Sequence, residues 1–206
     1  MPLDPHLLAA FTVATIVAML APGPDMLFVL SCGMRGGPRA GLLATAGLAT
    51  SEAVHVLVAA AGLSALFTAV PAAFTVLRVA GAVYLGWLGV RMIRQRGEAL
   101  SEKPGATGRR AYLSGFLTNL SNPKMIAFSV AFLPQFVDPA RGPVWAQFAV
   151  LGVILIFLEF VIDGAVGVGA GRIGSWLRER RTLSRRIDAA TGGILIGLGV
   201  RLAVER

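Results

Sequence analysis

Apolar residues in this chain gather into long runs separated by short stretches of basic and turn-forming residues. Six runs can be distinguished, at Pro5–Gly33, Ala40–Ala65, Ala72–Ile93, Ala111–Phe136, Pro143–Ile173 and Ile187–Ala203. An α-helix rises ~1.5 Å per residue, so about 20 residues cross a ~30 Å hydrocarbon layer. The pattern predicts an all-α integral membrane protein with six transmembrane helices.

Two of these runs contain residues that do not suit the interior of a helix. Pro22-Gly23-Pro24-Asp25 interrupts the first run, and Asn122-Pro123-Lys124 interrupts the fourth. Each proline removes a backbone donor and clashes with the preceding turn, which costs about 3 kcal/mol or more. We therefore expect the first and fourth helices to be broken at these two segments.

The interruptions belong to an internal repeat. Pro24-Asp25-Met26 corresponds to Pro123-Lys124-Met125, and Leu88-Gly89-Val90-Arg91 at the end of the third run corresponds to Leu198-Gly199-Val200-Arg201 at the end of the sixth. A unit of three spans is odd, so the second unit must enter the membrane in the opposite orientation. The sequence predicts inverted three-helix repeats at residues 1–95 and 111–206, joined by a basic cytoplasmic linker at residues 96–110.

The composition and the placement of charge agree with a membrane protein. Of 206 residues, 55% are hydrophobic and 15% are charged, whereas soluble domains carry about 25% charged residues. The formal net charge is +8, but most Lys and Arg residues follow the first, third and fifth runs. Cytoplasmic loops carry such an excess, so both termini are predicted to face outward and no nucleic-acid partner is expected.

Several smaller features refine this interpretation. The basic stretch from Arg178 to Arg186 suits anionic lipid headgroups. Cys32 is the single cysteine, so it can form no intramolecular disulfide and is expected to be a buried packing residue. The N-terminus lacks the basic region of a secretory signal, so the first span is expected to be retained. Glycine-rich spans permit close helix association, and with it a homo-oligomer.

Ionisable residues recur at one depth in four of the spans. They lie 10 to 14 positions from an arginine on the cytoplasmic flank, and they are Asp25, Glu52, Lys124 and Glu159. This spacing places them roughly 15–21 Å into the membrane. His55 follows Glu52 by three residues and Asp163 follows Glu159 by four, so each pair shares a helix face. Charges at this depth are costly and mark substrate or ion pathways.

Two interpretations of these charges stay open at this point. Carboxylates outnumber bases, and a surplus acid in a poorly solvated cavity is suited to load and release a proton. The candidates for proton coupling are Glu52, Glu159 and Asp163, together with His55, which titrates near neutrality. In the other interpretation, Lys124 only neutralises Asp25 or Glu159 and ties the two halves of the protein together.

Other functional classes have weaker support. An exporter of a divalent metal or another cation is one alternative, because the acids and His55 offer oxygen and nitrogen ligands. Lys124 at the same depth counts against it, and no protein-bound metal is expected. A membrane enzyme or lipid scramblase would need a nucleophile or metal triad that the sequence does not show. No cofactor is expected either.

The motifs together resemble the LysE/RhtB (lysine exporter / homoserine–threonine resistance) family. The matching segments cover essentially the whole chain and are Pro22-Gly23-Pro24-Asp25, Gly47-Leu48 with His55, Gly81-Ala82-Val83-Tyr84-Leu85, Leu88-Gly89, Asn119-Leu120-Ser121-Asn122-Pro123-Lys124 and Pro134-Gln135-Phe136. The resemblance implies a bacterial inner-membrane exporter of amino acids or close derivatives, driven by the proton gradient. Where relatives often carry Asp in the fifth span, this chain has Glu159, with a second acid at Asp163.

We therefore predict a secondary-active exporter, not an enzyme, for neutral amino acids such as threonine, homoserine or leucine, or for basic ones. The substrate is expected between the two helix breaks, with its carboxylate on the broken-helix amides and Lys124, and its ammonium on Asp25 or Glu52. The predicted substrate-binding residues are Pro22, Gly23, Pro24, Asp25, Glu52, Asn122, Pro123 and Lys124.

Overall fold

The structure is a computed structural model that describes residues 3–20, 23–69 and 105–172, with scattered positions between 79 and 94 and between 186 and 200. Every regular element in these ranges is helical, as the sequence predicts. The linker up to residue 104 and most of the third and sixth predicted spans lie outside the described residues. So does the basic Arg178–Arg186 stretch, apart from Arg186. The six-span inverted repeat stays a prediction.

The first two predicted spans form a helix that is broken once and bent once. Helix α1 covers Pro5–Leu20 and helix α2 covers Pro24–Ala69. Gly37 bends α2 with φ 73° and ψ −176°, a backbone conformation that favours glycine. The connection expected as a loop between the first two spans is therefore a sharp corner inside α2, followed by Pro38.

The fourth predicted span is also broken where expected. Helix α4 covers Arg109–Leu120 and helix α5 covers Pro123–Ala127, with Ser121 and Asn122 between them. Pro123 is the first residue of α5, where its missing N–H costs no helical hydrogen bond. The span continues as a π-helical turn, η2 (Phe128–Phe132), and a 3₁₀ turn, η3 (Leu133–Phe136).

Helix α6 covers Val144–Val168 and follows a short 3₁₀ turn, η4, at Pro139–Arg141. It runs antiparallel to the second half of α2. Gly152 faces Val56 near one end of the contact, whereas Gly167 faces the backbone of Gly41 near the other. Residues in the middle of α6 are therefore opposite the middle of α2.

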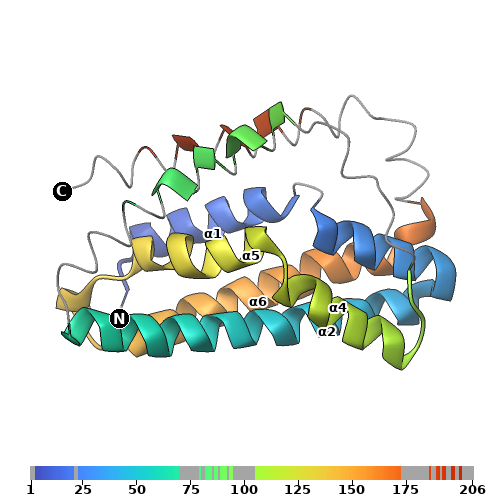
Figure 1. The fold of residues 1–206 in the computed structure, drawn as a ribbon, viewed down its shortest axis with the longest axis horizontal. Coiled ribbons are helices and arrows are strands. Elements are labelled where there is room, and N and C mark those ends of the chain that lie inside the picture. Colours follow the sequence, from blue (N-terminus) through green and yellow to red (C-terminus); the bar gives the residue numbers. More distant parts are fainter. Residues whose placement is uncertain are drawn as a thin grey trace.

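Helix α4 packs on another face of α2, in the parallel direction. A side chain at Gly115 would meet the Ala44 carbonyl, and Asn119 donates from Nδ2 to the Leu48 carbonyl at 3.0 Å. Figure 1 shows these helices along the long axis of the molecule, with both helix breaks near the middle of its length. The fold thus brings the two interrupted segments to one level.

Two apolar clusters lie on either side of the two helix breaks. One combines side chains of α1, η2, η3 and α6, and its aromatic centre is Phe11, which lies 5.6 Å from Phe132 and 5.2 Å from Phe136 between ring centroids. The other joins both halves of α2 to α4 and contains the buried Cys32, as expected for a packing residue. The polar side chains of the broken helices lie between the two clusters.

The outer surface is apolar over much of its area. Large side chains such as Leu57, Trp145 and Phe157 are more than 60% exposed. Within the described residues, α2 and α6 are long and apolar enough to cross a membrane. Because water would penalise so many exposed apolar groups, these faces suit contact with lipid.

One end of the molecule is tied by an ion pair between the N-terminus and η4. Arg141 Nη2 lies 2.8 Å from Asp4 Oδ2. The backbone N–H of His6, which donates to Asp4 Oδ1 at 2.8 Å, and the Arg141 guanidinium hold the pKa of Asp4 below its usual value. This bridge stabilises the folded protein at neutral pH. That contribution is lost as the pH falls through the lowered pKa of Asp4.

The close contact between α2 and α6 at Gly41 can be tested by substitution. A Cβ at Gly41 would lie 2.6 Å from the Gly167 carbonyl oxygen and 2.7 Å from its Cα, so Gly41→Val should force α2 and α6 apart. We expect a loss of about 1–3 kcal/mol in the free energy of unfolding, measured in detergent. Gly62→Val is the matched control, because a Cβ at Gly62 meets no atom of the described residues within 4 Å. An equal loss in both variants would contradict the contact.

Candidate functional site

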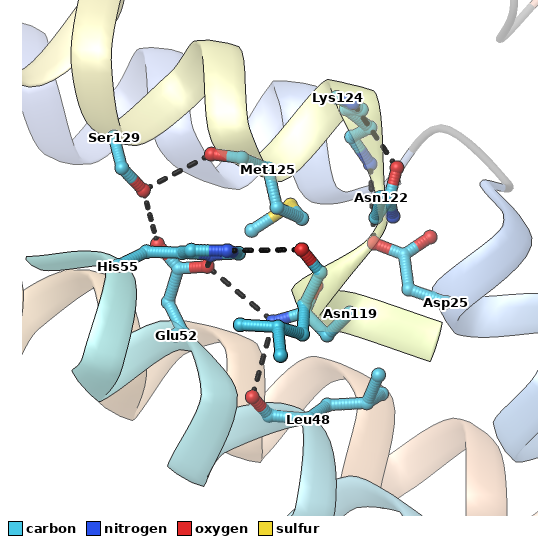
Figure 2. A network of polar contacts seen from close by, with 10 residues as sticks. Asp25, Leu48, Glu52, His55, Asn119, Asn122, Lys124, Met125 and Ser129 are labelled. Carbon is cyan, nitrogen blue, oxygen red and sulfur yellow. Dashed lines mark hydrogen bonds and ion pairs between the residues drawn. The ribbon is translucent and has the colours of Figure 1, made fainter. Parts of the chain in front are cut away.

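The two helix breaks meet through a buried pair of opposite charges (Figure 2). Lys124 Nζ lies 3.7 Å from Asp25 Oδ2, and both residues are buried. Gly23 stands beside the pair, because a Cβ there would meet Asp25 Oδ1 and lie 3.3 Å from Lys124 Nζ. The predicted repeat partners Asp25 and Lys124 are therefore neighbours in space.

The start of α5 is capped by its own chain. Asn122 Oδ1 accepts a hydrogen bond from the Lys124 amide at 3.1 Å, and the Asn122 carbonyl accepts from the Met125 amide at 3.1 Å. Three polar atoms near the breaks, Asp25 Oδ1, Asn119 Oδ1 and Asn122 Nδ2, have no hydrogen-bond partner among the described residues. A ligand can still engage them. Pro22 and the side chain of Pro123 lie outside the described part of the chain.

Glu52 on α2 is fully buried and both of its carboxylate oxygens are engaged. Ser129 donates from Oγ to Oε1 at 2.8 Å, while Oε2 lies 3.4 Å from Asn119 Nδ2 and 3.4 Å from His55 Nδ1. His55 Nε2 lies 3.4 Å from the Leu120 carbonyl oxygen. Glu52 and His55 thus contact the fourth span on both sides of its break, as Figure 2 shows.

The His55 ring links Glu52 to the fourth span. Both ring nitrogens face oxygen atoms, one in a carboxylate and one in a backbone carbonyl. An imidazole that donates from both nitrogens is an imidazolium. The geometry therefore fits a carboxylate–imidazolium pair between Glu52 and His55.

Helix α6 contributes two further acids to the same level. Glu159 and Asp163 are buried and lie one turn apart on one helix face. Glu159 lies within electrostatic range of Glu52, Asp25 and Lys124. The structure thus brings together the ionisable residues that the sequence places at one depth.

Sequence reasoning missed two side chains that complete this network, Asn119 and Ser129. Asn119 lies in the Asn119–Lys124 segment that resembles the LysE/RhtB family, and it is a polar residue inside an apolar run, so the sequence could have identified it. Ser129 has no such feature, because the π-helical turn that points its side chain at Glu52 changes the helical spacing. Its contact could not be derived from a regular period of 3.6 residues.

The metal-exporter alternative gains no support from this geometry. Within residues 3–20, 23–69, 105–172 and the scattered described positions, no three His, Cys, Asp or Glu side chains form a group that could hold a metal ion. Lys124 also places an ammonium beside Asp25. The network instead pairs acids with bases and hydrogen-bond donors.

Comparison with known proteins gives a consistent picture. A family model described as LysE type translocator matches residues 16–206. The chain is 34% identical to an uncharacterized membrane protein of Pseudomonas aeruginosa, covering 94% of this chain and 93% of the relative. It is 30% identical to a homoserine/homoserine lactone efflux protein of Salmonella typhimurium, covering 96% of each. It is 31% identical to a leucine efflux protein of Klebsiella pneumoniae, covering 94% and 92%. No solved structure matches.

Proposed function

Because the chain belongs to the LysE type translocator family, we propose that it exports amino acids or close derivatives across the bacterial inner membrane in exchange for protons. Relatives along nearly its full length are named efflux proteins, for leucine and for homoserine and its lactone. Those names describe transport rather than an enzymatic reaction. Small amino acids with an apolar or hydroxyl side chain are therefore the first substrates to test.

The observation that carries this proposal is the buried Asp25–Lys124 pair between two helix breaks. An amino-acid zwitterion carries the same two charges as this pair, in one small molecule. Its carboxylate can pair with Lys124 and with the positive N-terminal end of α2, and its ammonium with Asp25 Oδ1, which has no partner in the described structure. Binding between the breaks would exchange one ion pair for two.

The proposed orientation places the Gly37 corner and the start of α4 in the cytoplasm. Thr107, just before α4, lies against Gly36, so these segments share one end of the molecule. Cytoplasmic segments of membrane proteins carry an excess of Lys and Arg. Basic residues concentrate at this end, at Arg35, Arg39, Arg109, Arg110 and Arg172. The Asp4–Arg141 pair marks the opposite end, so the N-terminus faces outward.

The proposed exchange with protons rests on the surplus of buried acids. Glu52, Glu159 and Asp163 are the proposed coupling groups, with His55 beside Glu52. Lys124 and His55 cannot balance all of the buried carboxylates at this level. A proton that moves on and off one of them would link substrate export to the proton gradient.

Transport in everted membrane vesicles tests this function directly. An imposed proton gradient, acid inside, should drive uptake of labelled leucine or homoserine into vesicles that contain the protein. Vesicles without the protein provide the background. Accumulation that persists after an uncoupler collapses the gradient would contradict proton exchange, and no transport of any amino acid in a broad panel would contradict the function itself.

A further inference from the structure

Glu159 is a buried acid whose charge no described contact balances. Its side chain is 2% exposed, and neither carboxylate oxygen has a hydrogen-bond partner among the described residues. An ionised carboxylate in such a place is costly unless a proton or a cation neutralises it. Glu159 therefore requires a partner from outside the described network.

The location of Glu159 is the level of the helix breaks. Gly152 and Gly164 of α6 face Val56 and Thr45 of α2, so Glu159 is opposite the segment that carries Glu52. Asp25 and Lys124 lie within electrostatic range of it. Glu159 therefore lies at the level of the proposed substrate position.

The two bases at this level already have acid partners. Lys124 lies 3.7 Å from Asp25, and His55 lies 3.4 Å from Glu52. Glu52 also has both oxygens engaged by donors from the fourth span. Glu159 belongs to neither pair, and its neighbour Asp163 on the same helix is another buried acid rather than a base.

We propose, building on the function proposed above, that Glu159 is the group at which the substrate ammonium and the coupling proton compete. The Glu159 carboxylate either joins Asp25 Oδ1 in pairing with the substrate ammonium or takes a proton and becomes neutral. The two states exclude each other. In the cytoplasm the ammonium replaces the proton, and outside a proton replaces the ammonium, so one substrate leaves for each proton that enters.

This arrangement assigns different tasks to the acids. Of the acids named above as coupling groups, Glu52 then acts as a positioning residue, because its contacts hold the broken fourth span. Glu159 recognises the amino group that all substrates of this class share, and it makes the exchange obligatory. Ligands without a free amino group should therefore not be exported.

Exchange in proteoliposomes at equal pH on both sides tests the competition, because no proton gradient then drives transport. The full chain is reconstituted with unlabelled leucine or homoserine inside, and uptake of the labelled compound is measured between pH 5.5 and 8. In the wild type the KM should rise as the pH falls, with little change in the maximal rate. The amide of the amino acid, which keeps the ammonium, should inhibit, whereas the N-acetyl derivative should not.

Glu159→Gln should raise the KM at least tenfold, remove its dependence on pH and abolish inhibition by the amide. Glu159→Asp should restore part of the pH dependence. The Gln variant should be no less heat-stable than the wild type, because it removes an unpaired buried charge. Asp4→Asn, a carboxylate-to-amide change at the outer end, should keep the wild-type KM and pH profile.

The outcomes separate this inference from the proposed function. If the wild type exchanges amino acids but Glu159→Gln keeps the pH-dependent KM, the competition occurs at another titratable group, among Asp25, Glu52, His55 and Asp163, and the inference is wrong. If Glu159→Gln exchanges normally yet loses gradient-driven uptake, Glu159 carries protons without binding substrate, which also overturns it. If the wild type exchanges no amino acid, the proposed function fails first.

Discussion

Replacing Lys124 with methionine should reduce amino-acid export at least 30-fold while the protein still inserts and folds. Methionine keeps the length and the apolar contacts of the side chain but removes its ammonium. A buried charge pair that loses one member costs about 2–5 kcal/mol, and each 1.4 kcal/mol is a factor of about ten. Efflux of labelled substrate from preloaded cells, normalised to the amount of membrane-inserted protein, measures the effect.

Arg141→Met is the matched control for this loss. It removes another basic residue from an ion pair with an aspartate, but at the outer end of the molecule and partly exposed. We expect export within about twofold of the wild type, because exposed pairs contribute little. Asp25→Asn should resemble Lys124→Met, since it removes the other charge of the buried pair.

The charge swap Asp25→Lys with Lys124→Asp decides what the pair is for. If the two residues only hold the halves together, the swap keeps the attraction and should restore export. If they bind a zwitterion, the swap reverses the two charges relative to the adjacent helix ends and to Glu159, which stay as they are. Export should then stay lost. Restored export would remove Asp25 and Lys124 from the proposed site.

The placement of the site could be predicted from the sequence because its charges are rare against an apolar background. Asp25, Glu52, Lys124 and Glu159 stand out by type, and the constant rise of a helix converts their spacing into depth. The two proline-containing breaks could be predicted for a similar reason, since proline acts on its own backbone. Features of this kind depend on local chemistry.

The pairing inside the site could not be predicted in the same way. That Glu52 is engaged on both oxygens while Glu159 is not depends on helix rotation and on the π-helical turn at Ser129. The Gly37 corner likewise replaced an expected loop, because a single positive φ can redirect a continuous helix. Such outcomes depend on contacts between elements distant in sequence.

Glu52 should tolerate an amide but not an apolar side chain, and Glu52→Leu should be among the most damaging substitutions in the protein. Leucine would remove the charged acceptor that Asn119, Ser129 and the half-buried His55 share, and would leave Asn119 and Ser129 only their bonds to the Leu48 and Met125 carbonyls. A hydrogen bond to a charged group contributes about 1.5–3 kcal/mol, so the loss of several is a large part of the 5–15 kcal/mol typical of folded domains. We expect little folded protein in detergent extracts, and no export.

Glu52→Gln should fold and export at no less than about a tenth of the wild-type rate. The glutamine oxygen can accept from Asn119 and His55, while its amide donates to Ser129 Oγ, which then donates to the Met125 carbonyl 3.0 Å away. The network keeps its geometry and loses only its charge. A Gln variant that folds and exchanges amino acids but no longer responds to a proton gradient would show that Glu52 carries the proton, because its hydrogen bonds would be intact and only the titratable group would be missing.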